Sequence, residues 1–277
     1  MMKKKKNYNL VIGSILTGLM LLMILVGLFF LPYDPETMNI ELKFAGVSLR
    51  HPFGCDNYGR DIFTRVMVGA RTTLLVALGT VGIGAGVGVL IGAFTGYFGG
   101  WIDEVMMRVI DALFAFPSIL LALVVVSLFG SEKNQVLSLL FGSGKYQVII
   151  ALGIAFIPSF ARVVRSEYLK QREMDYVKNA RIMGCGHLRI MFVHILPNIL
   201  PVLVPTVMIG FNNAVLAEAG MSYLGIGVQP PDASLGRMLS EAQTFLFSQP
   251  SYALFPGLAI VVLVLGFSLL ADGLEER

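Results

Sequence analysis

Long apolar stretches separated by short polar segments run through the whole chain. A transmembrane helix needs about 20 mostly apolar residues, and five of the stretches come close to or exceed that length. A sixth stretch is shorter and weaker. The pattern therefore predicts an all-α, polytopic membrane protein with six transmembrane helices. The predicted spans are residues 10–31, 72–98, 109–129, 146–161 (the weaker one), 199–216 and 252–271.

The segment 162–198 is polar and basic, and it lies between two of these spans. Asp175 suits the N-cap of a short helix, and Gly184 and Gly186 are typical helix stop signals. Between these signals, apolar residues recur at helical spacing and so share one face of the predicted helix. They are Val177, Ala180 and Met183.

A second short helix is predicted at about 187–196, before Pro197 ends or bends it. Leu188, Met191 and Ile195 share one face of this helix. Two short amphipathic helices joined at a glycine bend form a compact projection that suits a groove on a partner protein. The basic residues also favour an interfacial helix that lies on anionic lipid, and the pattern alone leaves both interpretations open.

The second span carries a glycine at every fourth position, which places these residues in one line along a helix. They are Gly84, Gly88, Gly92, Gly96 and Gly100. Small residues four apart let two helix backbones approach closely in lipid, so we predict a helix-packing ridge. No register of these glycines gives the G-x-G-x-x-G pattern of a dinucleotide site.

Composition and charge agree with this picture. Hydrophobic residues make up 56 % of the 277 residues and charged residues only 14 %, whereas the apolar share of soluble domains is about 45–50 %. Basic residues lie before the first span, at positions 3–6, and cluster again in the segment 162–198. Because basic residues in short loops mark the cytoplasmic side, we expect both of these regions and both termini to be cytoplasmic.

The first span is predicted to be a retained anchor. Its apolar core is longer than the roughly 7–15 residues of a signal peptide, and no small-x-small cleavage site precedes Pro32. We therefore divide the chain into an anchor helix with an extracytoplasmic segment, 1–71, and a transmembrane core, 72–277, whose polar loop is 162–198.

The predicted extracytoplasmic segment contains side chains of types that bind metals, and it contains one of the two cysteines. His51, Cys55, Asp56 and Asp61 are all ligand types, but their spacing fits no zinc or calcium pattern, and a structural turn with Asp61 capping the next helix is favoured. Cys55 and Cys185 fall on opposite sides of the predicted membrane, so they do not pair with each other.

No catalytic residue and no metal site are predicted, because no nucleophile with its base and no ligand cluster appears within a span. Arg108 and Asp111 lie three residues apart at the start of the third span, and mutual pairing is favoured over a functional role. The sequence around Lys145 lacks the spacing of a phosphate-binding loop. An ion-coupled transporter or channel is a distant alternative, since three spans contain no ionisable residue.

Four separated motifs resemble the permease subunits of ATP-binding-cassette importers, in the dipeptide, oligopeptide and nickel branch, and most closely the second of its two permeases. In the polar loop, Ala180, Gly184, Leu196 and Pro197 match the loop signature. The other three motifs are HPFGCDNYGRDIFTRVMVGAR at 51–71, GYFGGWIDEVMMRVIDALFAFPS at 96–118 and AGMSYLGIGVQPPDASLG at 219–236.

The resemblance implies the type I importer permease fold, with cytoplasmic coupling helices that dock into a groove on a separate ATPase. It assigns ATPase coupling to the polar loop, and the implied coupling residues are Asp175, Tyr176, Ala180, Arg181, Gly184, His187, His194 and Pro197. Lys178 and Asn179 replace the usual acidic residue and alanine, and Leu235 replaces an aromatic residue. Residues 131–142 resemble an insertion.

The resemblance also implies the partners. They are a second related permease that faces the glycine-rich span or its neighbours, two cytoplasmic ATP-binding subunits, an extracytoplasmic substrate-binding protein and membrane lipid, with no nucleic acid. ATP and magnesium would bind the ATPases, so this chain would hold no cofactor. The implied location is the bacterial cytoplasmic membrane, and the implied substrate is a short peptide or, alternatively, nickel or a metal chelate.

Overall fold

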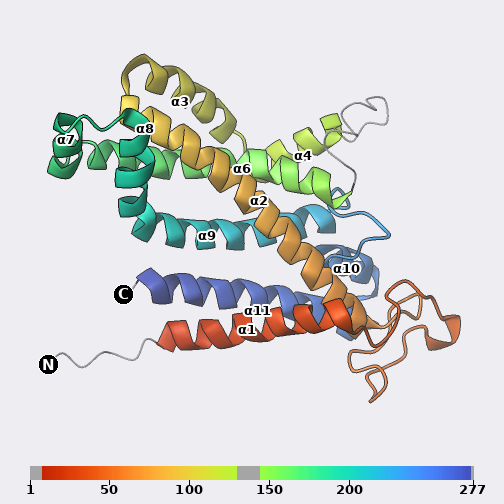
Figure 1. Ribbon diagram of the computed structural model, residues 1–277. Helices are drawn as coiled ribbons and strands as arrows, with labels where there is room; N and C mark the ends of the chain where they lie inside the picture. Colours follow the sequence, from red (N-terminus) through yellow and green to blue (C-terminus); the bar gives the residue numbers. More distant parts are fainter. Residues whose placement is uncertain (1–7, 130–143, 276–277) are drawn as a thin grey trace, which may run out of the picture.

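The computed structural model describes residues 8–129 and 144–275, and within them the chain folds into helices (Figure 1). The basic positions 3–6 and the predicted insertion 131–142 lie outside the described residues. The helices are α1 (Tyr8–Phe29), α2 (Ile62–Phe98), α3 (Gly100–Phe114), α4 (Ser118–Phe129), α6 (Lys145–Gln171), α7 (Asp175–Ile182), α8 (His187–Arg189), α9 (Leu196–Tyr223), α10 (Leu235–Ala242) and α11 (Pro250–Glu275), with short helical turns η1 (Ile40–Leu42) and η3 (Gln243–Phe245) and a π-helical segment η2 (Ile190–Ile195).

Five helices are long and apolar enough to cross a membrane, and α3 with α4 passes the same test only as a pair, bent by 91°. The all-α, polytopic prediction is therefore confirmed, with five spans, or six where the bent pair counts as one, whereas the predicted span 109–129 is not a continuous helix. The helix breaks between Ala115 and Pro117, because a proline supplies no amide hydrogen and disfavours helical backbone at the residue before it. The second span begins ten residues earlier than predicted, at Ile62, so the boundary placed at residue 71 falls inside α2.

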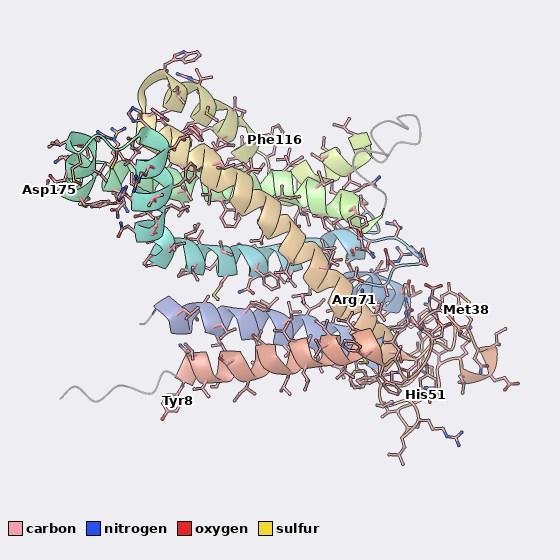
Figure 2. All side chains as sticks on the ribbon, in the orientation of Figure 1. Tyr8, Met38, His51, Arg71, Phe116 and Asp175 are labelled. Carbon is pink, nitrogen blue, oxygen red and sulfur yellow. The ribbon has the colours of Figure 1, made fainter. Side chains whose placement is uncertain are left out.

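The two ends of the bundle differ. Helices α7 and α8 lie at one end, which we call the α7 end, together with the start of α1 and the end of α11 (Figure 1). The segment that contains Met38 and His51 lies with α10 at the opposite end, the α10 end (Figure 2). The start of α1 and the end of α11 lie at the same end, as expected for a chain that crosses the bundle an even number of times.

The glycine ridge of α2 packs against α6 of the same chain. A methyl group added at Gly92 would stand 2.5 Å from the carbonyl oxygen of Ala161, and one added at Gly96 would stand 2.6 Å from Cβ of Tyr168. The predicted ridge is thus confirmed for Gly84, Gly88, Gly92 and Gly96, whereas a Cβ at Gly100 would meet open space. A second permease cannot use this face, because α6 already covers it.

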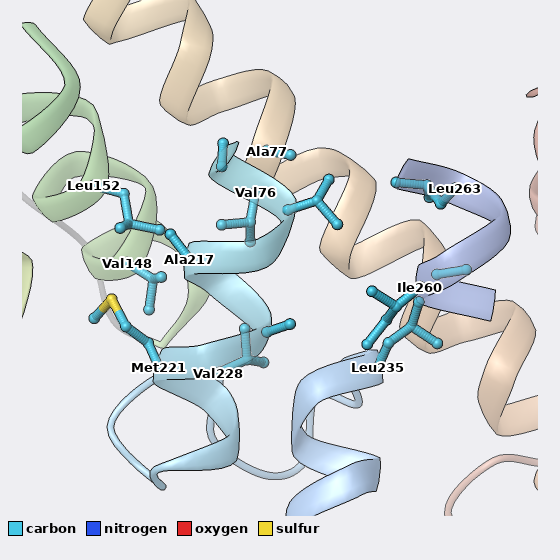
Figure 3. Close-up of a cluster of buried hydrophobic side chains, with 14 of the residues drawn as sticks. Val76, Ala77, Val148, Leu152, Ala217, Met221, Val228, Leu235, Ile260 and Leu263 are labelled. Carbon is cyan, nitrogen blue, oxygen red and sulfur yellow. The ribbon is translucent and has the colours of Figure 1, made fainter. Parts of the chain in front are cut away.

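The largest apolar core joins α2, α6, α9, α10 and α11. Figure 3 shows Val76 and Ala77 of α2 near Val148 and Leu152 of α6 and Ala217 of α9. Small side chains dominate these contacts, so the helix backbones lie close together. At the edge of the bundle, α1 packs on α11 in the same manner, since a Cβ at Gly13 would stand 2.6 Å from the backbone nitrogen of Leu270.

Gly92→Ala is expected to destabilise the protein by about 1–3 kcal/mol, the usual cost of forcing an extra methyl group into a packed contact. Gly86→Ala is the matched control: it lies on the same helix, but a Cβ there meets nothing within 4 Å. The control should be neutral or slightly stabilising, because alanine is the better helix former. Melting temperatures of both purified variants in detergent test this, and equal melting temperatures would contradict the α2–α6 contact.

Candidate coupling surface

The polar loop is built on an apolar cluster at the α7 end. Val177 and Ala180 of α7 are fully buried, against side chains of α2, α6, η2 and α9. The other buried members are Ala93, Tyr97, Val164, Tyr168, Ile190, Met191, Ile195 and Ile199. The shared face predicted for α7 is confirmed for Val177 and Ala180, and the structure shows that this face is buried. Ala180 therefore positions the helix and does not reach its outer surface.

Contrary to the prediction from helical spacing, Met183 does not share a face with Val177 and Ala180, and Leu188 does not share one with Met191 and Ile195. Met183 is 76 % exposed and Leu188 is 61 % exposed. The reason is that α7 ends at Ile182, so Met183 no longer follows the helical rotation. Gly184 then turns the backbone at φ +79°, which reverses the chain between the two short helices. In the second helical segment, Ile190 is buried together with Met191 and Ile195, and Leu188 is not.

The ends of α7 explain its length. Gly184 and Cys185 donate their backbone amides to the carbonyls of Arg181 and Ala180, each at 3.0 Å, which closes the C-terminus as the glycine stop signal predicts. Asp175 is the first helical residue and not the N-cap, because Met174 occupies the cap position. A negative side chain in the first turn still opposes the positive end of the helix dipole.

Two of the predicted coupling residues converge on an aromatic residue at the end of the glycine ridge. The Tyr97 hydroxyl lies 2.9 Å from Nδ1 of His187, and the Arg181 guanidinium lies 5.2 Å from the Tyr97 ring. Tyr168 donates its hydroxyl to the Met191 carbonyl at 3.0 Å. Tyr97 thus ties α7 and α8 to α2. No local sequence pattern indicates the contact between Tyr97 and His187, because the two residues are 90 positions apart in the chain.

The second predicted helix continues into the membrane. The chain runs from α8 through η2 and changes direction as it enters α9 (Figure 1). Pro197 lies in the first turn of α9, where its missing amide hydrogen costs no hydrogen bond. His194 is half-buried, and among the described residues its Nε2 has no hydrogen-bond partner. Tyr176 donates to Gln171 at 2.8 Å, and burial raises the pKa of its hydroxyl.

The outermost part of the loop is an apolar tip that the sequence did not indicate. We define the tip as Ile182, Met183 and Leu188, whose exposed fractions are 84 %, 76 % and 61 %. Charged residues rim the tip, and the exposed cations among them are Lys178, Arg181 and Arg189. The inward positions of Val177 and Ala180 could have located the tip, because the opposite face of a helix points outward. Apolar side chains with a basic rim suit an apolar groove with acidic edges.

A cluster of charged side chains lies at the α10 end, where Asp56, one of the candidate metal ligands, forms ion pairs. Asp56 accepts hydrogen bonds from Arg60 at 2.7 Å and from Arg65 at 2.6 Å. Both arginines also reach Glu241 of α10 at 3.0 Å, and Tyr252 of α11 donates to Glu241 at 3.2 Å. This clamp, formed by Asp56, Arg60, Arg65, Glu241 and Tyr252, fastens the segment before α2 to α2, α10 and α11.

The remaining candidate ligands also serve the turn. His51 Nδ1 lies 2.9 Å from Asp61, and Asp61 accepts the Thr64 amide at 2.7 Å, which confirms it as the N-cap of α2. Within residues 8–129 and 144–275, no three His, Cys, Asp or Glu side chains form a group that could hold a metal. Burial, with help from the nearby carboxylates of Asp61 and Asp56, raises the pKa of the Cys55 thiol to about 11.

Arg108 and Asp111 do not pair with each other as predicted. Arg108 reaches Glu104, one turn earlier on α3, at 3.0 Å, and Asp111 reaches Arg162 of α6 at 2.6 Å. The prediction failed because α6 runs beside α3 and offers a cation to Asp111. Arg165 adds a further α6–α3 ion pair with Asp103, 2.6 Å from Nη2 to the carboxylate.

The comparisons with known proteins agree with this architecture. Residues 88–277 match the family of binding-protein-dependent transport system inner membrane components. The chain belongs to this family. It is therefore a non-catalytic, multi-pass permease subunit with the type I fold of ATP-binding-cassette importers.

Named relatives match over nearly the whole chain. A dipeptide transport system permease protein DppC from Alkalihalophilus pseudofirmus is 38 % identical over 98 % of this chain and 86 % of its own length. A glutathione transport system permease protein GsiD from Pectobacterium atrosepticum is 37 % identical over 95 % of this chain and 85 % of its own. GsiD from Escherichia coli is 40 % identical over 92 % and 82 %.

Glu241→Gln is expected to lower the free energy of unfolding by about 3 kcal/mol at neutral pH, since it removes one partner of a buried charge cluster. Burial alone raises the pKa of Glu241, but the charges of Arg65 and Arg60 outweigh it, so the pKa lies below its usual value. This stabilisation is complete above the unfolded-state pKa, about 4.3, and is lost as the pH falls through the folded-state pKa.

Melting temperatures of wild type and Glu241→Gln are measured from pH 7 down to about pH 2.5, and the difference between them should stay constant above about pH 4.3 and narrow below it, as the folded-state carboxylate takes up its proton. Glu36→Gln, at an exposed position of the same segment, is the control and should leave the melting temperature unchanged. A difference that stays constant over the whole pH range would show that the carboxylate charge is not what stabilises the clamp.

Proposed function

We propose that this chain is one of two permeases in an ATP-driven importer of short peptides in the bacterial cytoplasmic membrane. The observation that carries the proposal is the match to dipeptide and glutathione permeases over 95–98 % of the chain. Glutathione is itself a tripeptide derivative, so both printed substrates are small and carry amide bonds and terminal charges. These names support peptides, and not nickel, as the proposed substrate class.

The apolar tip is the proposed contact with the ATPase. Its three side chains are exposed, yet the backbone beneath them is held by the buried cluster and by Tyr97. A rigid projection transmits the movement of a docked partner, whereas a flexible one would absorb it. The same three side chains could also insert into lipid, but the basic rim and the fixed turn at Gly184 favour a shaped protein groove.

The α7 end is the proposed cytoplasmic side, with both termini on that side. Support comes from the positive-inside rule, because this end carries a dense set of basic residues. They are Arg162, Arg165, Lys170, Arg172, Lys178, Arg181 and Arg189. The α10 end, with its clamped segment, would then face the substrate-binding protein.

The proposed complex contains this chain, a second related permease, two ATP-binding subunits and the binding protein. ATP and magnesium would be held by the ATPases. Closure of the ATPases would move the docked tip and rock the bundle between outward and inward access, as in other transporters in which rigid bodies move around a central path.

The double variant Ile182→Glu with Met183→Glu should insert into the membrane normally but lose the ATPase from the purified complex, because two buried carboxylates would oppose docking. We expect peptide uptake to fall at least tenfold, since two such charges cost well over about 1.4 kcal/mol. Leu49→Glu, at an equally exposed apolar site of the α10 end, is the control and should retain the ATPase.

The assay is co-purification with the ATPases, followed by binding-protein-dependent uptake of labelled trialanine. Wild-type-like recovery and uptake by the double variant would refute the tip as the coupling contact. A wild-type complex that hydrolyses ATP but transports nickel without competition by trialanine would refute the peptide assignment and leave the coupling assignment standing.

A further inference from the structure

A cavity of about 270 Å³ opens between α4, α6 and α9, within the membrane-spanning part of the bundle. Its polar lining comes from one side chain of each helix, Ser118, Ser159 and Asn213. Phe156 and Leu216 supply the apolar lining. At a rise of about 1.5 Å per residue, Asn213 lies roughly 25 Å along α9 and Ser159 roughly 21 Å along α6. Asn213 is therefore near the middle of its helix, and Ser159 lies near the end of the apolar part of α6, three residues before Arg162.

The three polar side chains are exposed, and none makes a hydrogen bond to another described residue. At this depth the alternatives for such groups are lipid, protein or water. A carboxamide that faces hydrocarbon leaves its donors and acceptors unmet, which costs several kcal/mol on the scale of transfer to a solvent without hydrogen bonds. The set therefore needs a polar partner on the open side of the cavity.

Asn212 and Asn213 are adjacent in α9 but differ in whether their amides find hydrogen-bond partners inside the fold. With its amide oriented to suit both partners, Asn212 donates to the Val264 carbonyl at 3.3 Å and accepts the Ser268 amide at 3.2 Å, both on α11. Its amide is thus satisfied inside the fold. Asn213 points instead into the α4–α6–α9 cavity, where this chain offers it no such pair.

The polar lining continues towards both ends of the bundle. A larger cavity of about 880 Å³ follows α4 and α6 to the α10 end and is lined there by Gln147, Gln229 and Asp232. In the other direction, Arg162 lies one turn beyond Ser159 on α6 and holds Asp111 of α3. One face of the molecule therefore offers polar groups from the α10 end to the crossing of α3.

We propose that the α4–α6–α9 face lines the route of the substrate, with Ser118, Ser159 and Asn213 donating to and accepting from the backbone amides of a transported peptide. The proposal rests on the proposed function for the nature of the substrate, but not for the presence of a water-filled route. Hydroxyl and carboxamide groups suit this task because they match peptide groups of any sequence and carry no charge that would trap the terminal charges.

The route is tested with single cysteines in the intact complex, in a background where Cys55 and Cys185 are replaced by alanine. Ser118→Cys, Ser159→Cys and Asn213→Cys should react with a membrane-impermeant maleimide, and trialanine with the binding protein and ATP should change the rate at least threefold. Leu22→Cys is the control, because Leu22 is 57 % exposed on α1 and its exposed neighbours there are apolar. It should stay unlabelled.

Labelling no faster than the Leu22 control would overturn the proposal, since the face would then lie against lipid. Oxidative crosslinking of Asn213→Cys to the second permease, without maleimide labelling, would also overturn it, because the face would then be a subunit contact. If the three positions label but trialanine and ATP leave the rates unchanged, and wild type does not take up trialanine, the peptide assignment fails while the aqueous route stands.

The hydrogen-bonding role is tested by uptake. Asn213→Leu should lower trialanine uptake about fivefold, in keeping with the loss of one net hydrogen bond, and Asn213→Gln should restore at least half of it. Uptake by Asn213→Leu equal to wild type, in a complex that assembles and hydrolyses ATP normally, would show that this side chain does not contact the peptide.

Discussion

The close approach of α2 and α6 is the contact on which the rest of the structure depends. Four glycines spaced four residues apart leave one line along α2 without side chains. Backbone and Cβ atoms of α6 occupy the space beside Gly84, Gly88, Gly92 and Gly96. This contact runs from the core near Gly84 to Gly96, next to the loop that carries the tip. Because the helices touch along several turns, a movement at the α7 end is passed along a stiff pair and not lost in side-chain rearrangement.

The coupling surface and the membrane core are parts of one packing system. Tyr97 follows directly on Gly96 and contacts both His187 and Arg181, while Tyr168, which lies against Gly96, bonds to the Met191 carbonyl. The tip is thus presented by side chains that also hold the helix pair together. At the α10 end, the ion pairs around Asp56 and Glu241 hold the segment before α2 in a comparable way, so both proposed partner surfaces rest on buried contacts.

Local pattern predicted much of this from the sequence. Apolar length located the spans, glycine spacing located the ridge, and the inward positions of Val177 and Ala180 followed from helical periodicity. The failures came where distant residues meet or where a helix ends. The pairing of Arg108 with Asp111 was wrong because their actual partners are Glu104 and, on α6, Arg162. Met183 was placed on one face with Val177 and Ala180, but it is the C-cap of α7 and no longer follows the helical rotation. The contact of Tyr97 with His187 and the polar cavity at Asn213 depend on chain crossings that no local pattern encodes.

We propose that the apolar tip, Ile182, Met183 and Leu188, contacts the ATPase. The most direct measurement is site-specific photo-crosslinking in the assembled complex, with a benzophenone side chain placed at Met183 and, separately, at Leu49. We expect a crosslink from position 183 to the ATPase and none from position 49 to that subunit. A product from position 183 that contains only lipid, or no crosslink to the ATPase in a complex that hydrolyses ATP, would contradict it.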